Sequence, residues 1–230
     1  EALVVTVDLA VPGLRFRDVR NGMTGGLGPL AQLAVNLERA SRLRWIADVA
    51  LGGRPLVFGT LASRLPGARS LPDFQEFVRS NFDPTVTWND IDWIRSQWDG
   101  PLVIKGVLDP DDARTALSVG AQALVVSNHG GRQPDGAPST IAALPAIADA
   151  VAGRLDVLFD GGVRGGVDVM KALASGARAC LMGRAWVFAL AALGEAGVAR
   201  LLASVRNELR VALALAGIDR VSDVGRDSLY

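Results

Sequence analysis

The residues best suited to chemistry lie in one short segment, 127–132, with the sequence Ser-Asn-His-Gly-Gly-Arg. It contains His129, the only histidine of the chain, directly after an apolar run. An imidazole can accept a proton near neutral pH, and the guanidinium of Arg132 can hold a carboxylate through two parallel hydrogen bonds. A lone histidine is more often structural, but the two glycines beside it leave room for a ligand. The pattern favours proton abstraction from a substrate that carries a carboxylate.

Two more charged side chains, Lys105 and Asp8, stand at the ends of apolar runs. A lysine in this position either reaches solvent along its own stem or directs its charge into a site. A carboxylate beside an imidazole favours the protonated form of the ring. A helix cap or a plain loop residue is the alternative for Asp8. Because Lys105 and His129 end strands in the same way, we assign all three side chains to one site.

Glycine and arginine recur after the last two apolar runs, in 160–164 (Asp-Gly-Gly-Val-Arg) and in Gly183-Arg184. Glycine lets backbone N–H groups approach an anion, and a helix N-terminus favours negative charge. Arginine adds charge-assisted hydrogen bonds. Two ordinary glycine turns with surface arginines are the alternative. Both segments occur in the order that barrel enzymes use to hold a phosphate group, so we predict a phosphate site.

Five strands are expected to position these residues. They read as continuous apolar runs rather than as alternating ones, which indicates a parallel sheet that is buried on both faces. The expected strands are 3–7, 101–105, 123–127, 156–159 and 179–182. Amphipathic helices are expected at 110–119, 145–151, 166–173 and 198–215, with Asp109 as an N-cap before Pro110 and with Gly176 and Gly217 as C-terminal stops.

Alternating strands and helices predict either a (β/α)8 barrel or a doubly wound sheet. A polar or glycine-bearing cluster follows every strand, and in a barrel these ends meet at one mouth, so we favour the barrel. Five strands would leave two bare edges in a fold that needs eight. We therefore expect residues 1–230 to be the C-terminal part of a single barrel domain, supplying about strands 4–8, with the remainder upstream.

Composition limits the classes of protein that fit. Lys plus Arg number 24, as do Asp plus Glu, so no net charge points to nucleic acid. A single cysteine excludes a disulfide framework and fits a reducing, cytoplasmic compartment. No apolar stretch was expected to reach the ~18 residues that a membrane span needs. We expect no metal ion at the site.

A long segment at about 22–86 interrupts the strand–helix rhythm and is far longer than an ordinary loop. Between Asn36 and Arg69 it is locally basic, with six arginines against Glu38 and Asp48, namely Arg39, Arg42, Arg44, Arg54, Arg64 and Arg69. Residues 44–51 and 56–58 mix arginine, tryptophan and aliphatic side chains, as helices at a membrane surface do. The alternative is that these apolar residues simply cover the barrel.

Taken together, these motifs resemble the FMN-dependent L-2-hydroxy-acid dehydrogenases and oxidases. Residues 6–8, 13–18 and 20–21 resemble the family's fourth strand and the following loop, and 103–108 resemble the fifth. The family's signature is similar to 126–133, followed by Asp135-Gly136. Residues 160–164 and 182–185 resemble its two FMN phosphate loops. The resemblance runs nearly from end to end.

The resemblance implies a role for each matching residue. His129 would be the active-site base with Asp8 as its partner, and Lys105 would lie beside the flavin N1 and C2 oxygen. Arg132 and Arg15 would hold the substrate carboxylate. The residues implied to bind FMN are Thr6, Lys105, Ser127, Asp160, Gly162, Arg164, Gly183 and Arg184. Pro134 departs from the family's usual leucine. The substrate-binding tyrosines of the family lie on earlier strands, and the sole tyrosine here is Tyr230.

Within the family, residues 81–84 and 88–100 are similar to the bacterial quinone-linked L-lactate dehydrogenases. That implies oxidation of an L-2-hydroxy acid, with electrons passed to quinone, by a homotetramer attached to the inner face of the cell membrane. The fragment alone would be inactive and would need the N-terminal remainder of the barrel. An oxygen-using oxidase, a mandelate-type dehydrogenase and a flavin enzyme acting on a modified peptide are alternatives. So are a non-catalytic flavin- or phosphate-binding barrel and a phosphosugar enzyme without flavin.

Overall fold

The computed structural model describes residues 1–21, 28–50, 58–65, 67 and 71–229. The chain divides into two compact units. One unit joins Glu1–Ala10 to Thr85–Tyr230, and the other consists of Val11–Pro84. The first unit contains the predicted sheet, and the second contains most of the long segment that interrupts the strand–helix rhythm.

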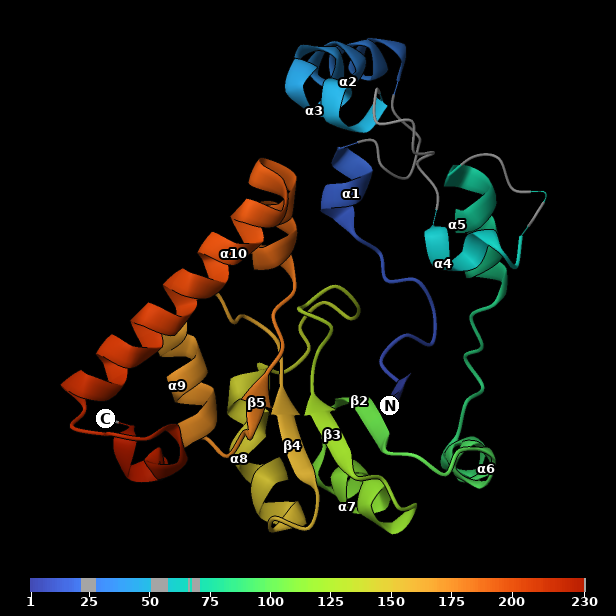
Figure 1. Cartoon of the computed structure of the whole chain (residues 1–230). Coiled ribbons are helices and arrows are strands. Elements are labelled where there is room, and N and C mark those ends of the chain that lie inside the picture. Colours follow the sequence, from blue (N-terminus) through green and yellow to red (C-terminus); the bar gives the residue numbers. More distant parts are fainter. Residues whose placement is uncertain (22–27, 51–57, 66, 68–70, 230) are drawn as a thin grey trace. The chain divides into compact units, whose positions relative to one another are not determined.

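The first unit is built on a parallel sheet whose strands follow one another in sequence order (Figure 1). The strands are β1 (Leu3–Thr6), β2 (Leu102–Val107), β3 (Ala123–Val126), β4 (Asp156–Phe159) and β5 (Ala179–Cys180). All four neighbouring pairs are parallel. Each expected strand is present, and their carboxyl ends share one edge of the sheet.

Burial explains why the central strands lack an alternating pattern. On one face Leu102, Ile104 and Leu124 belong to the main hydrophobic core, which the helices cover. On the other face Val103 and Val125 belong to a second, smaller cluster. A strand that is apolar on both faces needs a cover on both faces, as strands in a closed barrel have. The described chain thus has the α/β architecture of part of a (β/α)8 barrel.

Helices alternate with these strands. They are α6 (Trp88–Gln97), α7 (Pro110–Ser118), α8 (Thr140–Val151), α9 (Gly166–Ala174) and α10 (Arg184–Leu215), followed by the 3-10 turns η1 (Val221–Asp223) and η2 (Arg226–Ser228). Asp109 caps α7 as predicted, because its Oδ1 accepts from the N–H of Asp111 at 2.7 Å. At α6, the Thr87 hydroxyl and N–H both donate to Asp90 Oδ2 at 2.7 Å. These hydrogen bonds lower the pKa of the Asp90 carboxyl.

One predicted helix start was wrong. Helix α8 begins at Thr140 rather than at 145, and Pro145 lies inside it. Proline lacks an N–H but fits a helix when its neighbours tolerate one missing hydrogen bond. Helix α10 spans Arg184–Leu215, but the backbone at Gly194 (φ 61°) is not helical, so a kink separates its first part from the stretch that contains the predicted helix 198–215.

Helix α10 also corrects the expectation about membrane spans. By length and composition it could cross a membrane, with a mean hydropathy of 1.5 over 18 residues. It packs along α9, and Glu208 Oε2 accepts from the N–H of Gly166 at 2.8 Å. Part of α10 is thus held against α9 within the first unit.

The second unit consists of short helices in its described part: α1 (Phe16–Arg20), α2 (Pro29–Ser41), α3 (Leu43–Ala50), α4 (Gly59–Ala62) and α5 (Leu71–Ser80). Leucines 30, 33 and 37 of α2 are all exposed. The predicted surface segment 44–58 lies only partly within the described residues, and Arg54 and Arg69 lie outside them. The assignment of residues 1–230 to one barrel domain with a long variable loop stays a prediction.

Candidate functional site

The carboxyl ends of β1, β2 and β3 bring together side chains from distant parts of the sequence. Asp8 follows β1, Lys105 lies in β2, and His129 follows β3. The His129 Nδ1 atom lies 2.9 Å from Asp8 Oδ1, across 121 positions of sequence. Lys105 Nζ lies 3.7 Å from Asp8 Oδ2. The three side chains are 24%, 17% and 11% exposed for His129, Lys105 and Asp8, so their charges act on one another with little screening by water.

The hydroxyl of Ser127 connects these three groups. Ser127 is fully buried, and its Oγ accepts from Lys105 Nζ at 2.8 Å and from the His129 N–H at 3.1 Å. The same hydroxyl donates to Asp8 Oδ2 at 3.4 Å. A buried hydroxyl that is satisfied as donor and acceptor fixes the groups around it. Thr6, which pairs with Lys105 in the sheet register, is half-buried beside this network.

A fourth strand adds a second carboxylate. Asp160 follows β4, and its Oδ2 lies 3.2 Å from Lys105 Nζ. The ammonium group of Lys105 therefore lies between the carboxylates of Asp8 and Asp160. The other oxygen, Asp160 Oδ1, is buried and has no hydrogen-bond partner in the structure. A buried acceptor without a donor is costly, so this atom marks a place where a ligand hydroxyl could donate.

The residue after Lys105 must be glycine for this site to form. Gly106 has φ 112°, and an added Cβ would lie 2.7 Å from the Asp8 Cβ. The sheet register also shifts here, between Lys105 and Val107. The bulge lets Asp8 approach the strand end closely. The sequence contains this signal as Lys-Gly at a strand end, but its role in placing Asp8 was not predicted.

The loop after β3 carries the predicted base and carboxylate ligand. His129 has φ 57°, and Gly130 and Gly131 both have φ 68°, so three successive residues are left-handed. Arg184, at the start of α10, donates from Nη2 to the Gly130 carbonyl at 2.8 Å. Arg132 lies in the same turn and is half-buried.

The two predicted phosphate loops differ. At the start of α9, the N–H groups of Arg164 and Gly165 donate to Asp168 Oδ2 at 2.9 and 3.2 Å, and that of Gly166 donates to Glu208. Carboxylates thus accept from three N–H groups at that helix N-terminus, and the predicted phosphate contacts of this loop stay a prediction. Gly162 and Gly183, by contrast, have open space where a side chain would be. The start of α10, at Gly183-Arg184, is the helix N-terminus that suits a phosphate group.

The predicted site residues thus divide into three groups. Asp8, Lys105, Ser127, His129 and Asp160 form one hydrogen-bonded network, and Arg184 reaches its loop. Gly162, Gly183 and the exposed Arg164 lie in the loops after β4 and β5. Arg15 belongs to the second unit, where it precedes α1 as its N-cap residue. Its predicted role with the substrate carboxylate stays a prediction. Sequence reasoning missed Asn128, whose polar side chain within the signature segment was a readable signal.

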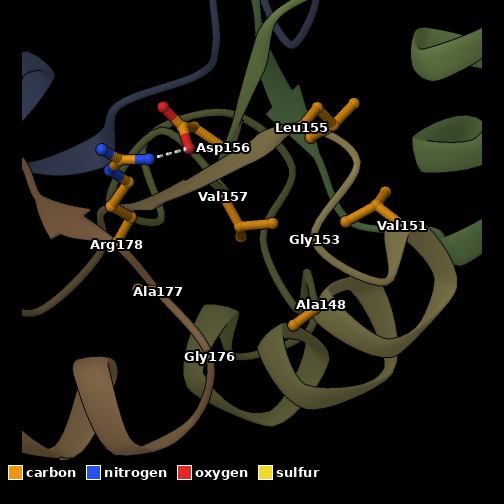
Figure 2. Close-up of a pocket in the computed structure, with 9 residues that line it drawn as sticks. All are labelled: Ala148, Val151, Gly153, Leu155, Asp156, Val157, Gly176, Ala177 and Arg178. Carbon is orange, nitrogen blue, oxygen red and sulfur yellow. Dashed lines mark hydrogen bonds and ion pairs between the residues drawn. The ribbon is translucent and has the colours of Figure 1, made fainter. Parts of the chain in front are cut away.

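The opposite end of the sheet has a pocket of a different kind. It has a volume of about 350 Å³ and lies where β4 and β5 begin (Figure 2). Mostly small and apolar residues line it, with one ion pair between Arg178 Nη1 and Asp156 Oδ1 at 2.7 Å. None of the predicted site residues lies in it.

Comparison with known proteins identifies the protein family. The model of the FMN-dependent dehydrogenase family matches residues 1–230, and the chain belongs to that family, whose cofactor is FMN. An L-lactate dehydrogenase of Stenotrophomonas maltophilia (strain R551-3) is 52% identical over 99% of the chain. One of Chromohalobacter salexigens is 49% identical over 100% of the chain. The chain spans only 59% and 58% of these relatives.

Solved structures support the fold assignment. A crystal structure of the monotopic membrane protein (S)-mandelate dehydrogenase matches 99% of the chain and 59% of its own length, with 32% identity and a TM-score of 0.85. A crystal structure of mandelate oxidase matches 97% of the chain and 54% of its own length, with 38% identity and a TM-score of 0.72. These neighbours are barrel enzymes, so the predicted fold class is confirmed and the chain covers part of the barrel.

The residues of the described site fit FMN. Asp160 Oδ1 is a buried acceptor that a ribityl hydroxyl could satisfy, and the ammonium of Lys105 is held at the same strand ends. Gly183 leaves space for a phosphate group at the N-terminus of α10, and Arg184 adds a positive charge there. All of these groups come from the first unit.

Proposed function

We propose that the complete protein containing this chain oxidises an L-2-hydroxy acid, with L-lactate as the first candidate, to the 2-oxo acid. The observation that carries the proposal is the His129–Asp8 pair, 2.9 Å apart, beside the charged Lys105. Family membership and the L-lactate dehydrogenase relatives support the same reaction. A binding module without catalysis would have no need of a base with its own carboxylate partner.

The orientation of His129 assigns its two nitrogens. Because Nδ1 faces Asp8, this nitrogen carries the hydrogen that Asp8 accepts, and Nε2 keeps its lone pair for the substrate. When Nε2 takes up the substrate proton, the carboxylate of Asp8 stabilises the imidazolium that forms. Arg132 would hold the substrate carboxylate from the same turn, and Arg15 keeps the partner role that the resemblance implies.

The remaining residues would bind and orient the cofactor. FMN, when bound, supplies the acceptor for the two electrons that leave the substrate. Lys105 would place positive charge where negative charge develops, held there by Ser127, Asp8 and Asp160. Asp160, Thr6 and Gly162 would contact the ribityl chain and ring, and Gly183, Arg164 and Arg184 would hold the phosphate.

The test uses the yellow colour of the flavin. The complete protein with FMN is mixed with L-lactate without oxygen, and bleaching of the flavin absorbance is followed. We expect His129→Ala to keep FMN but to slow bleaching by ~100-fold or more, the usual contribution of a general base. Bleaching at the original rate in this variant would refute the assignment of the base. A complete protein that binds no FMN would refute the proposed function itself.

We further propose that the electrons pass to quinone at a membrane surface on the cytoplasmic side. The support is the exposed apolar row on α2, where Leu33 and Leu37 are 56% and 64% exposed, on a helix that also carries Arg39 in its last turn. The mandelate dehydrogenase neighbour is described as a monotopic membrane protein. Apolar side chains combined with arginine on one helix suit the boundary of an anionic bilayer.

Paired substitutions test this attachment. Leu33→Ser with Leu37→Ser should move the complete protein from the membrane to the soluble fraction of lysed cells. Leu202→Ser on α10, a residue that is 57% exposed, serves as the matched control and should not change the partition. Unchanged partition of the α2 variant would remove the membrane proposal, and reduction of dioxygen faster than of a quinone analogue would favour the oxidase alternative.

A further inference from the structure

The loop that carries His129 is held in a conformation that amino acids other than glycine rarely adopt. His129, Gly130 and Gly131 are left-handed in succession, at φ 57°, 68° and 68°. A histidine with this backbone persists only where its surroundings determine it strongly. The groups that hold this loop therefore decide where the imidazole lies.

One side chain fastens the loop at both of its ends. Asn128 Oδ1 accepts from the Gly131 N–H at 3.2 Å, and the Asn128 backbone carbonyl accepts from the same group at 3.0 Å. The Asn128 Nδ2 group donates to the Pro138 carbonyl at 3.1 Å. The carboxamide thus closes the tight turn on one side and fixes the return of the chain ten residues later. Only a side chain with both an acceptor and a donor can do this.

The backbone after β4 lies close to the Asn128 carboxamide. A Cβ added to Gly161, after β4, would lie 3.3 Å from Asn128 Oδ1 and 2.5 Å from Thr140 Oγ1. Thr140 is buried, and its hydroxyl donates to the Gly161 carbonyl at 3.3 Å. From the other side Arg184 holds the Gly130 carbonyl. Groups from the end of β4 and from the starts of α8 and α10 therefore surround the loop. Asn128 is the residue that makes the contacts within the loop.

We propose that Asn128 is a positioning residue, which sets the direction of the His129 imidazole toward Asp8 and toward the substrate by closing the left-handed turn. The inference rests on the proposed function, because it requires His129 to act as the base. Asn128 acts through the loop and not on the substrate itself. Because a displacement of about 1 Å can slow a reaction ~100-fold, loss of this carboxamide should affect the reaction more than it affects cofactor binding.

The chain offers a matched control at the opposite end of β3. Gln122 precedes the strand as Asn128 follows it, and its side-chain amide also joins two backbone groups. Its Oε1 accepts from the Leu102 N–H at 2.8 Å, and its Nε2 donates to the Gly120 carbonyl at 2.7 Å. Gln122→Ala therefore removes a similar set of hydrogen bonds at a distance from the site.

The experiment compares Asn128→Ala, Asn128→Asp and Gln122→Ala in the complete protein loaded with FMN. The Asn128→Asp variant keeps the acceptor for the Gly131 N–H but places a carboxylate oxygen against the Pro138 carbonyl. It serves as the test variant if Asn128→Ala does not fold. Three quantities are measured: the rate of flavin reduction by saturating L-lactate per bound FMN, the dissociation constant of FMN, and hydrogen exchange in peptides covering 128–138.

We expect both Asn128 variants to reduce flavin ~10–100-fold more slowly, with FMN affinity within a factor of about 3 and with faster exchange in 128–138. Gln122→Ala should lower Tm while leaving all three quantities near those of the unmodified protein. The proposal would be overturned if both Asn128 variants reduced flavin at the rate of the unmodified protein. It would also be overturned if Gln122→Ala slowed flavin reduction as much as the Asn128 variants do. If the unmodified protein reduces no flavin with any 2-hydroxy acid, the proposed function fails instead, and the exchange data still decide whether Asn128 holds the loop.

Discussion

The two ends of the parallel sheet use similar residue types in different surroundings. At the amino end, Arg178 and Asp156 pair at 2.7 Å with side chains that are 74% and 48% exposed (Figure 2). At the carboxyl end, Lys105 pairs with Asp8 and Asp160 with all three side chains less than a fifth exposed. Charges in water contribute little to stability, whereas buried ones are costly unless they are fully paired. The buried pairs therefore indicate which end of the sheet has the chemistry.

The sharpest test of this contrast is Lys105→Met. It removes the cation from between two carboxylates, so that Asp160 loses its ion-pair partner while Asp8 keeps its contacts with His129 and Ser127. We expect the free energy of unfolding of the complete protein to fall by about 3 kcal/mol, and FMN affinity to fall with it. Denaturant unfolding and flavin titration measure the two effects. Lys171→Met, which alters the only other lysine of the chain and an exposed one, is the control. Equal stability of the two variants would contradict the buried network.

A second change affects the same end through the backbone. In Gly106→Ala, the new methyl group would clash with Asp8 and the backbone would be strained at φ 112°. Such strain costs about 1–3 kcal/mol. We expect a loss of stability of that size and a displaced Asp8, which slows flavin reduction. Gly153→Ala is the control, because Gly153 also has a positive φ but has open space where a Cβ would lie. It shows the cost of backbone strain without the clash. If both variants reduce flavin equally fast, the approach of Asp8 to the strand end does not matter.

The amino end should tolerate the loss of its ion pair. For Arg178→Ala we expect a change of less than about 1 kcal/mol in the free energy of unfolding, because water screens the pair. Flavin reduction should stay the same. Thermal unfolding at low and high salt is the measurement, and any difference from the unmodified protein should shrink as salt rises. A loss of unfolding free energy as large as that of Lys105→Met would contradict the proposed difference between the two ends of the sheet.

The smallest effect is expected at the N-cap of α6. Hydrogen bonds from Thr87 lower the pKa of the Asp90 carboxyl below its ordinary value of 3.8. The folded state therefore holds this proton less tightly than the unfolded chain does. The stabilisation is complete above pH 3.8 and is lost as pH falls through the lowered value. Asp90→Asn should be slightly less stable than the unmodified protein at pH 7, with the difference vanishing in acid. A constant difference across pH would contradict this origin.

Much of this arrangement could be predicted from the sequence, because strand ends in a parallel sheet converge whatever the loops between them do. That rule alone brought Asp8, Lys105 and His129 together. It could not assign the left-handed turn to Asn128, which depends on side-chain hydrogen bonds within the loop, or the bulge to Gly106, which depends on the distant Asp8. Nor could local patterns predict that the N–H of Gly166 donates to Glu208, which lies 42 positions away.

At α8, two local sequence signals for the helix start competed, and the prediction followed the wrong one. Pro145 resembled a helix start, yet Ser139 precedes the first turn of α8 and the apolar pattern runs through the proline. At Pro145 the surrounding apolar pattern outweighed a residue that disfavours helix. Gly194, by contrast, interrupts α10, because its backbone (φ 61°) is not helical.

Strand β5 ends with Cys180, the single sulfur nucleophile available in the chain. Burial, and to a smaller extent the charge of Asp168, raises the pKa of this thiol to about 11. A thiol that is protonated at neutral pH reacts slowly with maleimides and with peroxide. A cysteine introduced on an exposed helix such as α2 could therefore be labelled selectively with a fluorophore in this chain without first removing the native one.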